Sequence, residues 1–168
     1  LELARFKEDG RCSSLVVTGC MAQRYSKELV SDIPEIDAVI GVHQYQKIVP
    51  LLDQLQNDGD TLRDIRRVPL ATDFSYPRIV QTPPHSVYLK IAEGCDRRCT
   101  FCIIPAIRGK QGSRTVASLV EEARNLAARG ARELNLISQD TTWYGKDLPE
   151  PATLPDLLRG LNDIEGIQ

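Results

Sequence analysis

The chain has 168 residues, of which 42% are hydrophobic and 26% are charged, with a formal net charge of −2 at pH 7. This composition is typical of a soluble globular protein, and the near-neutral charge argues against a surface that coats nucleic acid broadly. No run of about 18 apolar residues occurs and residues 1–10 lack a secretory signal, so we expect a cytoplasmic protein without membrane contact. Five cysteines, three of them clustered, indicate metal or redox chemistry rather than a secreted disulfide framework.

An α/β unit is predicted for the first part of the chain. Residues 15–18 form a short apolar run that ends at Gly19, as expected of a buried strand. Residues 24–30 are compatible with a helix, and residues 36–40 form a second apolar run that stops at Gly41. This order of strand, helix and strand predicts a β-α-β unit.

A further helix is expected to close this unit, and a linker should follow it. From Gln44 on, apolar residues recur at helical spacing, and Pro50 fits such a helix only near its first turn or at a kink. Residues 57–86 contain four prolines, many charges and no sustained period. We therefore interpret them as a linker with irregular structure.

The second part of the chain begins with a predicted strand at residues 87–91, which leads directly to the clustered cysteines. Residues 116–127 carry apolar side chains at helical spacing, and residues 133–138 form another apolar strand. A strand, a helix and a strand in this order form a right-handed parallel crossover. A helix at residues 154–161 would begin the next crossover, so we expect the sheet to be incomplete within this chain.

Two segments are expected to share one face of this second α/β piece. The cysteines follow the strand at residues 87–91, and residues 139–144 follow the strand at residues 133–138. In parallel α/β folds, ligands collect at the carboxyl ends of the strands. The cysteines and residues 139–144 are therefore predicted to belong to one site.

The three clustered cysteines are Cys95, Cys99 and Cys102, in the spacing C-x-x-x-C-x-x-C. Three thiolates from one loop can bind three irons of a [4Fe-4S] cluster, which leaves the fourth iron open for substrate or cofactor. The arginines between them favour the thiolate form. A structural zinc site would need a fourth protein ligand, for which His85 is the candidate, so a zinc module is the alternative.

At this loop the chain resembles radical S-adenosylmethionine enzymes, whose signature is C-x-x-x-C-x-aromatic-C, with Phe101 in the aromatic place. The resemblance implies a partial or full (β/α) barrel and a [4Fe-4S] cluster whose open iron binds S-adenosylmethionine. It also implies a 5′-deoxyadenosyl radical that abstracts hydrogen from carbon. The protein would then supply ligation, orientation and exclusion of water.

The resemblance narrows to the methylthiotransferase family through two motifs, TGCMAQRY at residues 18–25 and EGCDRRCTFCIIPAIRGKQGSR at residues 93–114. With LISQDTTWYG at residues 136–145, the second motif is similar to the RimO-type branch, which methylthiolates the β-carbon of an aspartate in a small-subunit ribosomal protein. The MiaB-like branch, which acts on an isopentenylated adenosine of tRNA, more usually reads EGCNKYCTYCVVP. It is the alternative with the same cluster chemistry.

This family resemblance implies a domain organisation. Residues 1–56 match the C-terminal part of an α/β methylthiotransferase domain with an auxiliary cluster, residues 57–86 the linker, and residues 87–168 the first β/α units of a radical SAM (β/α) barrel. Two upstream cysteines, the rest of the radical domain and a C-terminal TRAM domain have no counterpart here. The chain is therefore expected to be a fragment that is inactive alone.

The family also implies roles for individual residues. Cys95, Cys99 and Cys102 match the radical-cluster ligands, and Cys20 matches the last of three ligands of the auxiliary cluster, which gives two [4Fe-4S] clusters in the intact enzyme. The cysteines act as ligands, so no catalytic side chain is assigned. Cys12 matches nothing and is interpreted as a structural thiol.

Cofactor contacts are assigned to Phe101, Ser138 and Gln139, although a plain turn after the strand is an equal alternative for the last two. Basic and aromatic residues nearby either meet cofactor or substrate or are simply solvated or packed; these are Arg108, Lys110, Arg114, Trp143 and Tyr144. The expected partners are a ribosomal protein substrate, an electron donor and a sulfur donor, and no direct readout of nucleic acid is expected.

Overall fold

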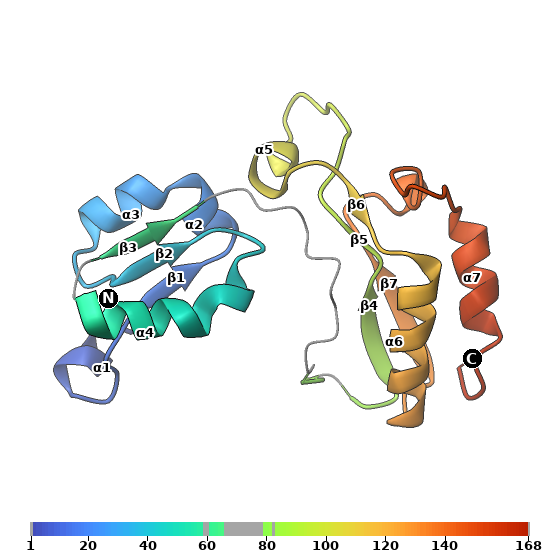
Figure 1. The fold of residues 1–168 in the computed structure, drawn as a ribbon, viewed down its shortest axis with the longest axis horizontal. Coiled ribbons are helices and arrows are strands. Elements are labelled where there is room, and N and C mark those ends of the chain that lie inside the picture. Colours follow the sequence, from blue (N-terminus) through green and yellow to red (C-terminus); the bar gives the residue numbers. More distant parts are fainter. Residues whose placement is uncertain (1, 59–60, 66–78, 82, 168) are drawn as a thin grey trace. The chain divides into compact units, whose positions relative to one another are not determined.

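The computed structural model describes residues 2–58, 61–65, 79–81 and 83–167. The chain divides into two compact units, Leu1–Pro69 and Leu70–Gln168. Both contain parallel strands connected through helices, which confirms the predicted α/β class (Figure 1). In the part of the chain that is described, no helix is both long and apolar enough to span a membrane.

The first unit contains a parallel sheet of three strands in the order β1-β2-β3. Each strand has three residues, with Val16 opposite Ala38 and Ala38 opposite Leu62. The strands are β1 (Val16–Thr18), β2 (Ala38–Ile40) and β3 (Leu62–Asp64). The described helices are α1 (Arg5–Glu8), α2 (Cys20–Arg24), α3 (Ser26–Asp32), the 3-10 helix η1 (Tyr45–Lys47) and α4 (Ile48–Asp58).

The core of this unit forms because apolar strand residues alternate between two faces that are both covered by helices. In Figure 1, α2 and α3 lie on one side of the sheet and α4 lies on the other. Pro50 is the third residue of α4, where its missing N–H costs no helical hydrogen bond. The buried side chains Ala22, Leu29, Ile36 and Val39 form one cluster.

Two details of the first unit differ from the sequence prediction. The helix expected at residues 24–30 is two helices, because Tyr25, with φ −117° and ψ 34°, interrupts them, and the first already begins at Cys20. Within the predicted linker, Leu62–Asp64 forms strand β3. Residues 59–60, 66–78 and 82 of that linker lie outside the described residues.

The second unit is built around the parallel pair β4 (Ser86–Lys90) and β7 (Glu133–Ile137), in which Leu89 lies opposite Leu136. The crossover between them contains helix α6 (Val116–Ala128), as predicted. A short antiparallel pair, β5 (Ala92–Glu93) and β6 (Gly112–Ser113), extends beyond β4. The remaining described elements are α5 (Ile104–Arg108), the 3-10 helix η2 (Thr141–Trp143) and α7 (Leu154–Asn162).

Helices α6 and α7 pack against one face of the β4–β7 pair, and the core lies between them (Figure 1). Both helices have side-chain caps that fix where they begin: Thr115 accepts from the Ser118 N–H, and Thr153 forms a capping box with Asp156. The buried core residues include Val87, Leu89, Ile91, Leu119, Ala123, Leu126, Leu157 and Leu161. The parallel pairing of β4 with β7 places their carboxyl ends side by side, and the helical layer covers one face of the pair.

Candidate metal centre

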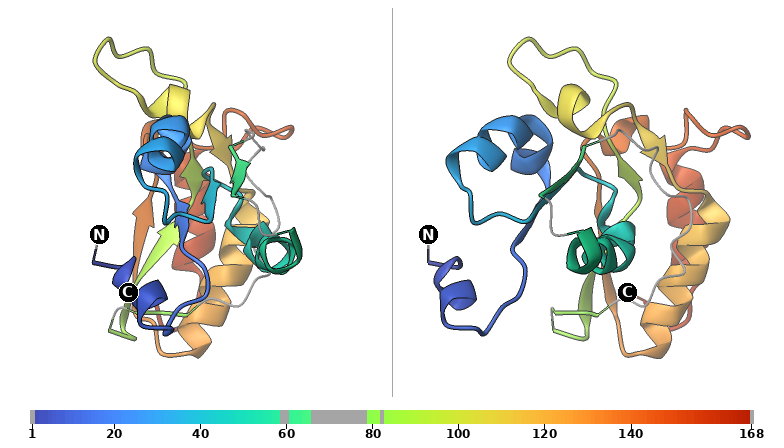
Figure 2. Two further views of the ribbon diagram at one scale, coloured as in Figure 1. Left: turned by 90° about the vertical axis from the view of Figure 1, so that its left-hand side faces the viewer. Right: turned by 60° about the vertical axis from the view of Figure 1, so that its left-hand side comes forward.

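The three clustered cysteines lie on a loop of residues 94–103, here called the cysteine loop, which connects β5 to α5 and projects beyond the strand end (Figure 2). Cys95 lies two residues after the end of β5 and is 8% exposed, whereas Cys99 is exposed and Cys102 is half-buried. The Cys102 N–H donates to the Cys99 carbonyl at 3.0 Å, so these two cysteines share one turn. All three thiols are free.

Buried contacts fasten the start of the cysteine loop to the end of α5, the helix that follows the loop. Glu93, only 2% exposed, accepts from Lys90 Nζ at 2.6 Å and forms an ion pair with Arg108 of α5. Burial by itself raises the pKa of Glu93, but the hydrogen bonds from these two cations outweigh it, and the net effect lowers the pKa. The Cys95 N–H also donates to the Gly109 carbonyl at 3.2 Å. The loop is therefore held at a closed base.

Two of the basic residues considered as ligand contacts are engaged within the fold. Arg108 pairs with Glu93, and Arg114 is buried, where it pairs with Glu122 and donates to Ser118 Oγ at 3.0 Å. The Arg114 contacts tie the end of β6 to α6, and the Arg108 ion pair ties α5 to β5. Lys110 is exposed.

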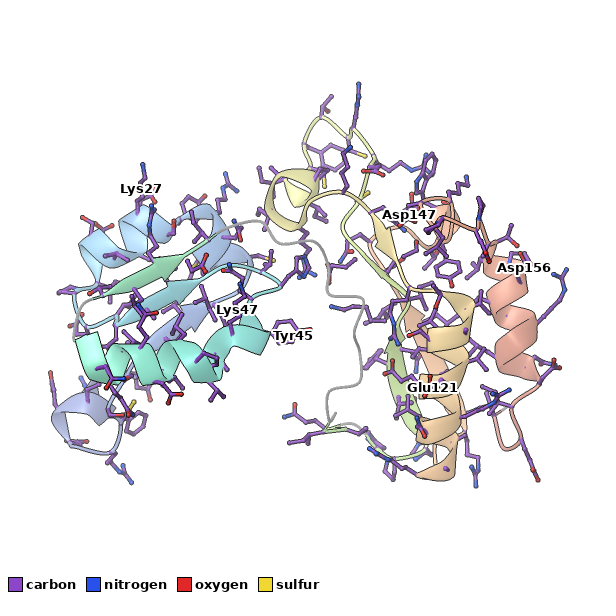
Figure 3. The ribbon with its side chains drawn as sticks, in the orientation of Figure 1. Lys27, Tyr45, Lys47, Glu121, Asp147 and Asp156 are labelled. Atoms are coloured by element: carbon purple, nitrogen blue, oxygen red, sulfur yellow. The ribbon has the colours of Figure 1, made fainter. Side chains whose placement is uncertain are left out.

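The segment after β7 is fastened to β6, next to the base of the cysteine loop. Tyr144 is buried and its hydroxyl donates to the Arg114 carbonyl at 2.8 Å; burial raises the pKa of Tyr144 to about 12. Asp147, labelled in Figure 3, accepts from the Ser113 N–H at 2.7 Å, and the Gly145 N–H donates to Ser113 Oγ at 3.0 Å. Tyr144 therefore packs in the core.

The structure brings the cysteine loop and residues 139–144 together, as predicted. Arg97 donates from Nε to Asp140 Oδ2 at 2.6 Å, and its guanidinium lies 4.7 Å from the centre of the Trp143 ring. Hydrogen bonds from Thr142 and from Arg97 lower the pKa of Asp140. The hydrogen bond between Arg97 and Asp140 also raises the pKa of Arg97. Arg97 and Asp140 are 43 positions apart, and sequence reasoning did not pair them.

Several buried polar atoms at this end of the strands have no hydrogen-bond partner among the described residues. They include Ser138 Oγ, Gln139 Oε1 and both amide atoms of Gln111, a side chain that is 6% exposed. A buried polar group without a partner costs about 1–3 kcal/mol, so a polar ligand that reached these atoms would recover that energy. Gln111 was not predicted, because a glutamine between two glycine turns carries no signal in the sequence.

The register places these atoms on both sides of the strand that leads to Cys95. The Ile91 N–H donates to the Ile137 carbonyl at 3.0 Å, and the Ile91 carbonyl accepts from the Arg114 N–H at 3.0 Å. Ser138 and Gln139 thus follow the strand on one side, and Gln111 precedes the strand on the other. Two strand spacings, about 10 Å, separate the two sides.

The remaining predicted residues have less enclosed positions. Phe101 is 91% exposed, so within the described residues it covers little protein surface. Cys20 is the first residue of α2 in the other unit, where Gln23 of the same helix donates to the Ile65 carbonyl at 2.9 Å and accepts from the Val42 N–H at 3.2 Å. These bonds hold Cys20 at the carboxyl edge of the β1-β2-β3 sheet. Cys12 donates to the Ser14 carbonyl at 3.0 Å.

The donor set fits an iron–sulfur cluster better than a zinc ion. His85 precedes β4 and Cys95 follows β5, and an extended strand advances about 3.3 Å per residue, so roughly 25 Å of strand separates them. Among the described residues, no three Cys, His, Asp or Glu side chains lie close enough together to hold a metal ion, and this includes the three thiols of the cysteine loop. What the loop offers is three soft thiols without a fourth ligand, together with an N–H donor to sulfur, since the Arg97 N–H lies 3.4 Å from Cys95 Sγ.

Comparisons with known proteins identify the class. Residues 89–161, which contain the cysteine loop, α6 and β7, match the model of the radical SAM superfamily. Proteins of this superfamily use S-adenosylmethionine and an iron–sulfur cluster.

The particular relatives are proteins named ribosomal protein uS12 methylthiotransferase RimO. The chain is 46% identical to that of Desulforamulus reducens over 167 residues, 44% to that of Geobacter sulfurreducens over 167 and 47% to that of Symbiobacterium thermophilum over 168. These matches cover 99%, 99% and 100% of this chain and 38%, 37% and 34% of the relatives. The predicted resemblance to RimO-type methylthiotransferases is confirmed, and the chain spans little more than a third of their length.

Proposed function

We propose that the enzyme containing this chain adds a methylthio group to the β-carbon of an aspartate in ribosomal protein uS12. The observation that carries this proposal is the similarity to uS12 methylthiotransferases along the whole chain, which includes both Cys20 and the cysteine loop. A ribosomal protein substrate also agrees with the formal net charge of −2, which offers no broad basic surface for tRNA.

The residues of this chain have distinct tasks in the proposed reaction. Cys95, Cys99 and Cys102 hold one [4Fe-4S] cluster, and Cys20 is one ligand of a second cluster. When bound, the cofactors supply hydrogen abstraction from carbon and transfer of the methylthio group. An electron donor and a sulfur donor are the further partners of this reaction.

Contacts to S-adenosylmethionine fall to Ser138 and Gln139 in this proposal, and Gln111 joins them. Their unpartnered buried atoms support this role, because a carboxylate and an ammonium group on the cofactor can accept from and donate to them. Phe101 follows the second ligand of the cysteine loop and is exposed enough to cover a bound cofactor. The base of the loop, closed by Glu93 and Arg108, would keep the ligands in place.

The substrate test compares ribosomal protein with tRNA. The full-length enzyme is reconstituted anaerobically with iron and sulfide and incubated with S-adenosylmethionine, a reductant and either uS12 or tRNA. Mass spectrometry of uS12 peptides should show one methylthio group in place of one hydrogen on an aspartate. The tRNA from the parallel reaction should be unmodified. Methylthiolated adenosine with unmodified uS12 would overturn the proposal in favour of the tRNA branch.

A separate prediction concerns Ser138. Because its Oγ has no described partner, Ser138→Ala should leave the free energy of unfolding of the cofactor-free protein unchanged or slightly higher. Its affinity for S-adenosylmethionine should fall about tenfold, the loss of one hydrogen bond to a charged group. Urea unfolding and equilibrium dialysis with the reconstituted protein measure the two quantities.

Ser113→Ala is the matched control for this prediction. Ser113 Oγ accepts from the buried Gly145 N–H, so its removal should lower the free energy of unfolding by about 1–3 kcal/mol. If Ser138→Ala destabilised the cofactor-free protein as much as Ser113→Ala does, Ser138 would be a structural residue and its cofactor role would be lost.

A further inference from the structure

Arg97 makes four contacts that connect separate parts of the second unit. Its Nε donates to Asp140 Oδ2 at 2.6 Å, its Nη2 donates to Thr142 Oγ1 at 3.3 Å, and its guanidinium stacks on Trp143. Its backbone N–H donates to Cys95 Sγ at 3.4 Å. The first three contacts hold the side chain, and the fourth touches a cluster ligand.

The carboxylate of Asp140, which accepts the hydrogen bond from Arg97, is held in place by its own turn. Asp140 caps η2: its Oδ1 accepts from the Thr142 N–H at 3.0 Å and from the Thr142 hydroxyl at 2.6 Å. Its other oxygen, Oδ2, faces Arg97, and the Asp140 side chain is 14% exposed. A carboxylate held in one orientation by its own turn costs less entropy to pair than one that moves freely.

Because Arg97 lies within the cysteine loop, its side-chain contacts also restrain the loop backbone. Arg97 lies two residues after Cys95 and two before Cys99, so a fixed Arg97 side chain restrains the backbone between two ligands. Asp140 follows Ser138 and Gln139 directly. The contacts therefore span the interval between the proposed cluster ligands and the proposed cofactor contacts.

We propose that Arg97, Asp140, Thr142 and Trp143 form a latch that sets the cysteine loop at a fixed distance from the cofactor-binding end of β7. Arg97 is thus a positioning residue, which acts through Cys95 and Cys99 rather than on the cofactor. The latch has two expected effects: it orders the cysteine loop before any cluster binds, and it raises the affinity for S-adenosylmethionine. Only the effect on affinity rests on the proposed function, because the ordering of the loop is a property of the chain itself.

The chain offers a matched control at the same aromatic ring. Lys146 Nζ lies 4.2 Å from the centre of the Trp143 ring, so Lys146→Gln also removes a cation from this ring. Lys146 belongs to the segment after η2 and has no bond to the cysteine loop among the contacts described above. A difference between Arg97→Gln and Lys146→Gln therefore measures the latch rather than the loss of a cation–π contact.

The test is peptide-level hydrogen exchange on the full-length, cluster-free protein. Arg97→Gln and Asp140→Asn should each speed up amide exchange within residues 94–103 about tenfold, the double variant should match either single variant, and Lys146→Gln should leave exchange unchanged. After anaerobic reconstitution, the latch variants should bind S-adenosylmethionine about tenfold more weakly at equal iron content.

The outcomes separate the latch from the proposed function. Equal exchange in Arg97→Gln and Lys146→Gln, or additive effects of Arg97→Gln and Asp140→Asn, would overturn the latch whatever the enzyme modifies. Faster exchange in the latch variants of an enzyme that does not modify uS12 would keep the latch and reject the substrate.

Discussion

Cys99→Ala is expected to remove one iron–sulfur cluster from the anaerobically reconstituted protein, a loss of about four irons per chain, the content of one cube. Two remaining thiols on a loop cannot hold three irons, and among the described residues no group of three or more Cys, His, Asp or Glu side chains occurs that could replace the lost ligand. Since Cys99 is exposed, the substitution should leave the free energy of unfolding of the cluster-free protein within about 0.5 kcal/mol. Iron and acid-labile sulfide analysis, with electron paramagnetic resonance of the reduced protein, measures the loss.

Cys12→Ala provides the control for this experiment. Cys12 belongs to the first unit and donates to the carbonyl of Ser14, two residues away, so its removal should leave the iron content unchanged. Equal iron loss in the two variants would contradict the ligand assignment. Bound zinc without sulfide in the unsubstituted protein would show that the cysteine loop is a zinc site.

Much of the fold follows from the sequence, because its main elements are carried by strong local patterns. The strands at residues 87–91 and 133–138 are apolar runs bounded by turns, and helix α6 combines an apolar stripe with a Thr115 cap. Strand β3 was missed because its sequence LRD is polar, and only pairing with β2 makes it a strand. The two-residue strands β5 and β6 are likewise too short to leave a pattern.

The site divides in the same way. The spacing of three cysteines predicts the ligand set, because three thiolates from one loop are the donors that an open iron–sulfur cluster requires. The parallel topology predicts which segments meet at the strand ends. Neither identifies the bond between Arg97 and Asp140, which depends on a side-chain geometry set by η2. The unpartnered amide of Gln111 is equally invisible until the fold buries it.

Gly94→Ala should be among the most disruptive single substitutions in the second unit. Gly94 has φ +80°, and a Cβ there would fall on the Lys110 carbonyl oxygen, 2.7 Å from the Lys110 carbonyl carbon and 2.8 Å from the Gly109 carbonyl oxygen. The left-handed backbone costs an alanine about 1–2 kcal/mol. The clash adds about 1–3 kcal/mol, because the obstructing atoms are backbone and cannot rotate away.

Relief of this clash should also disturb the base of the cysteine loop. Relieving it moves Gly109 and Lys110 away from Gly94, which breaks the hydrogen bond from the Cys95 N–H to the Gly109 carbonyl and opens the closed base of the loop. Gly94→Ala should therefore lower the free energy of unfolding by about 2–5 kcal/mol and reduce the iron bound on reconstitution. Gly130, with φ +103° and no atom within 4 Å of an added Cβ, is the control: Gly130→Ala should cost only about 1–2 kcal/mol and keep the full iron content. Urea unfolding measures the free energy of unfolding of both variants, and iron analysis measures their cluster content. Full cluster loading in Gly94→Ala would mean that the closed base does not position Cys95.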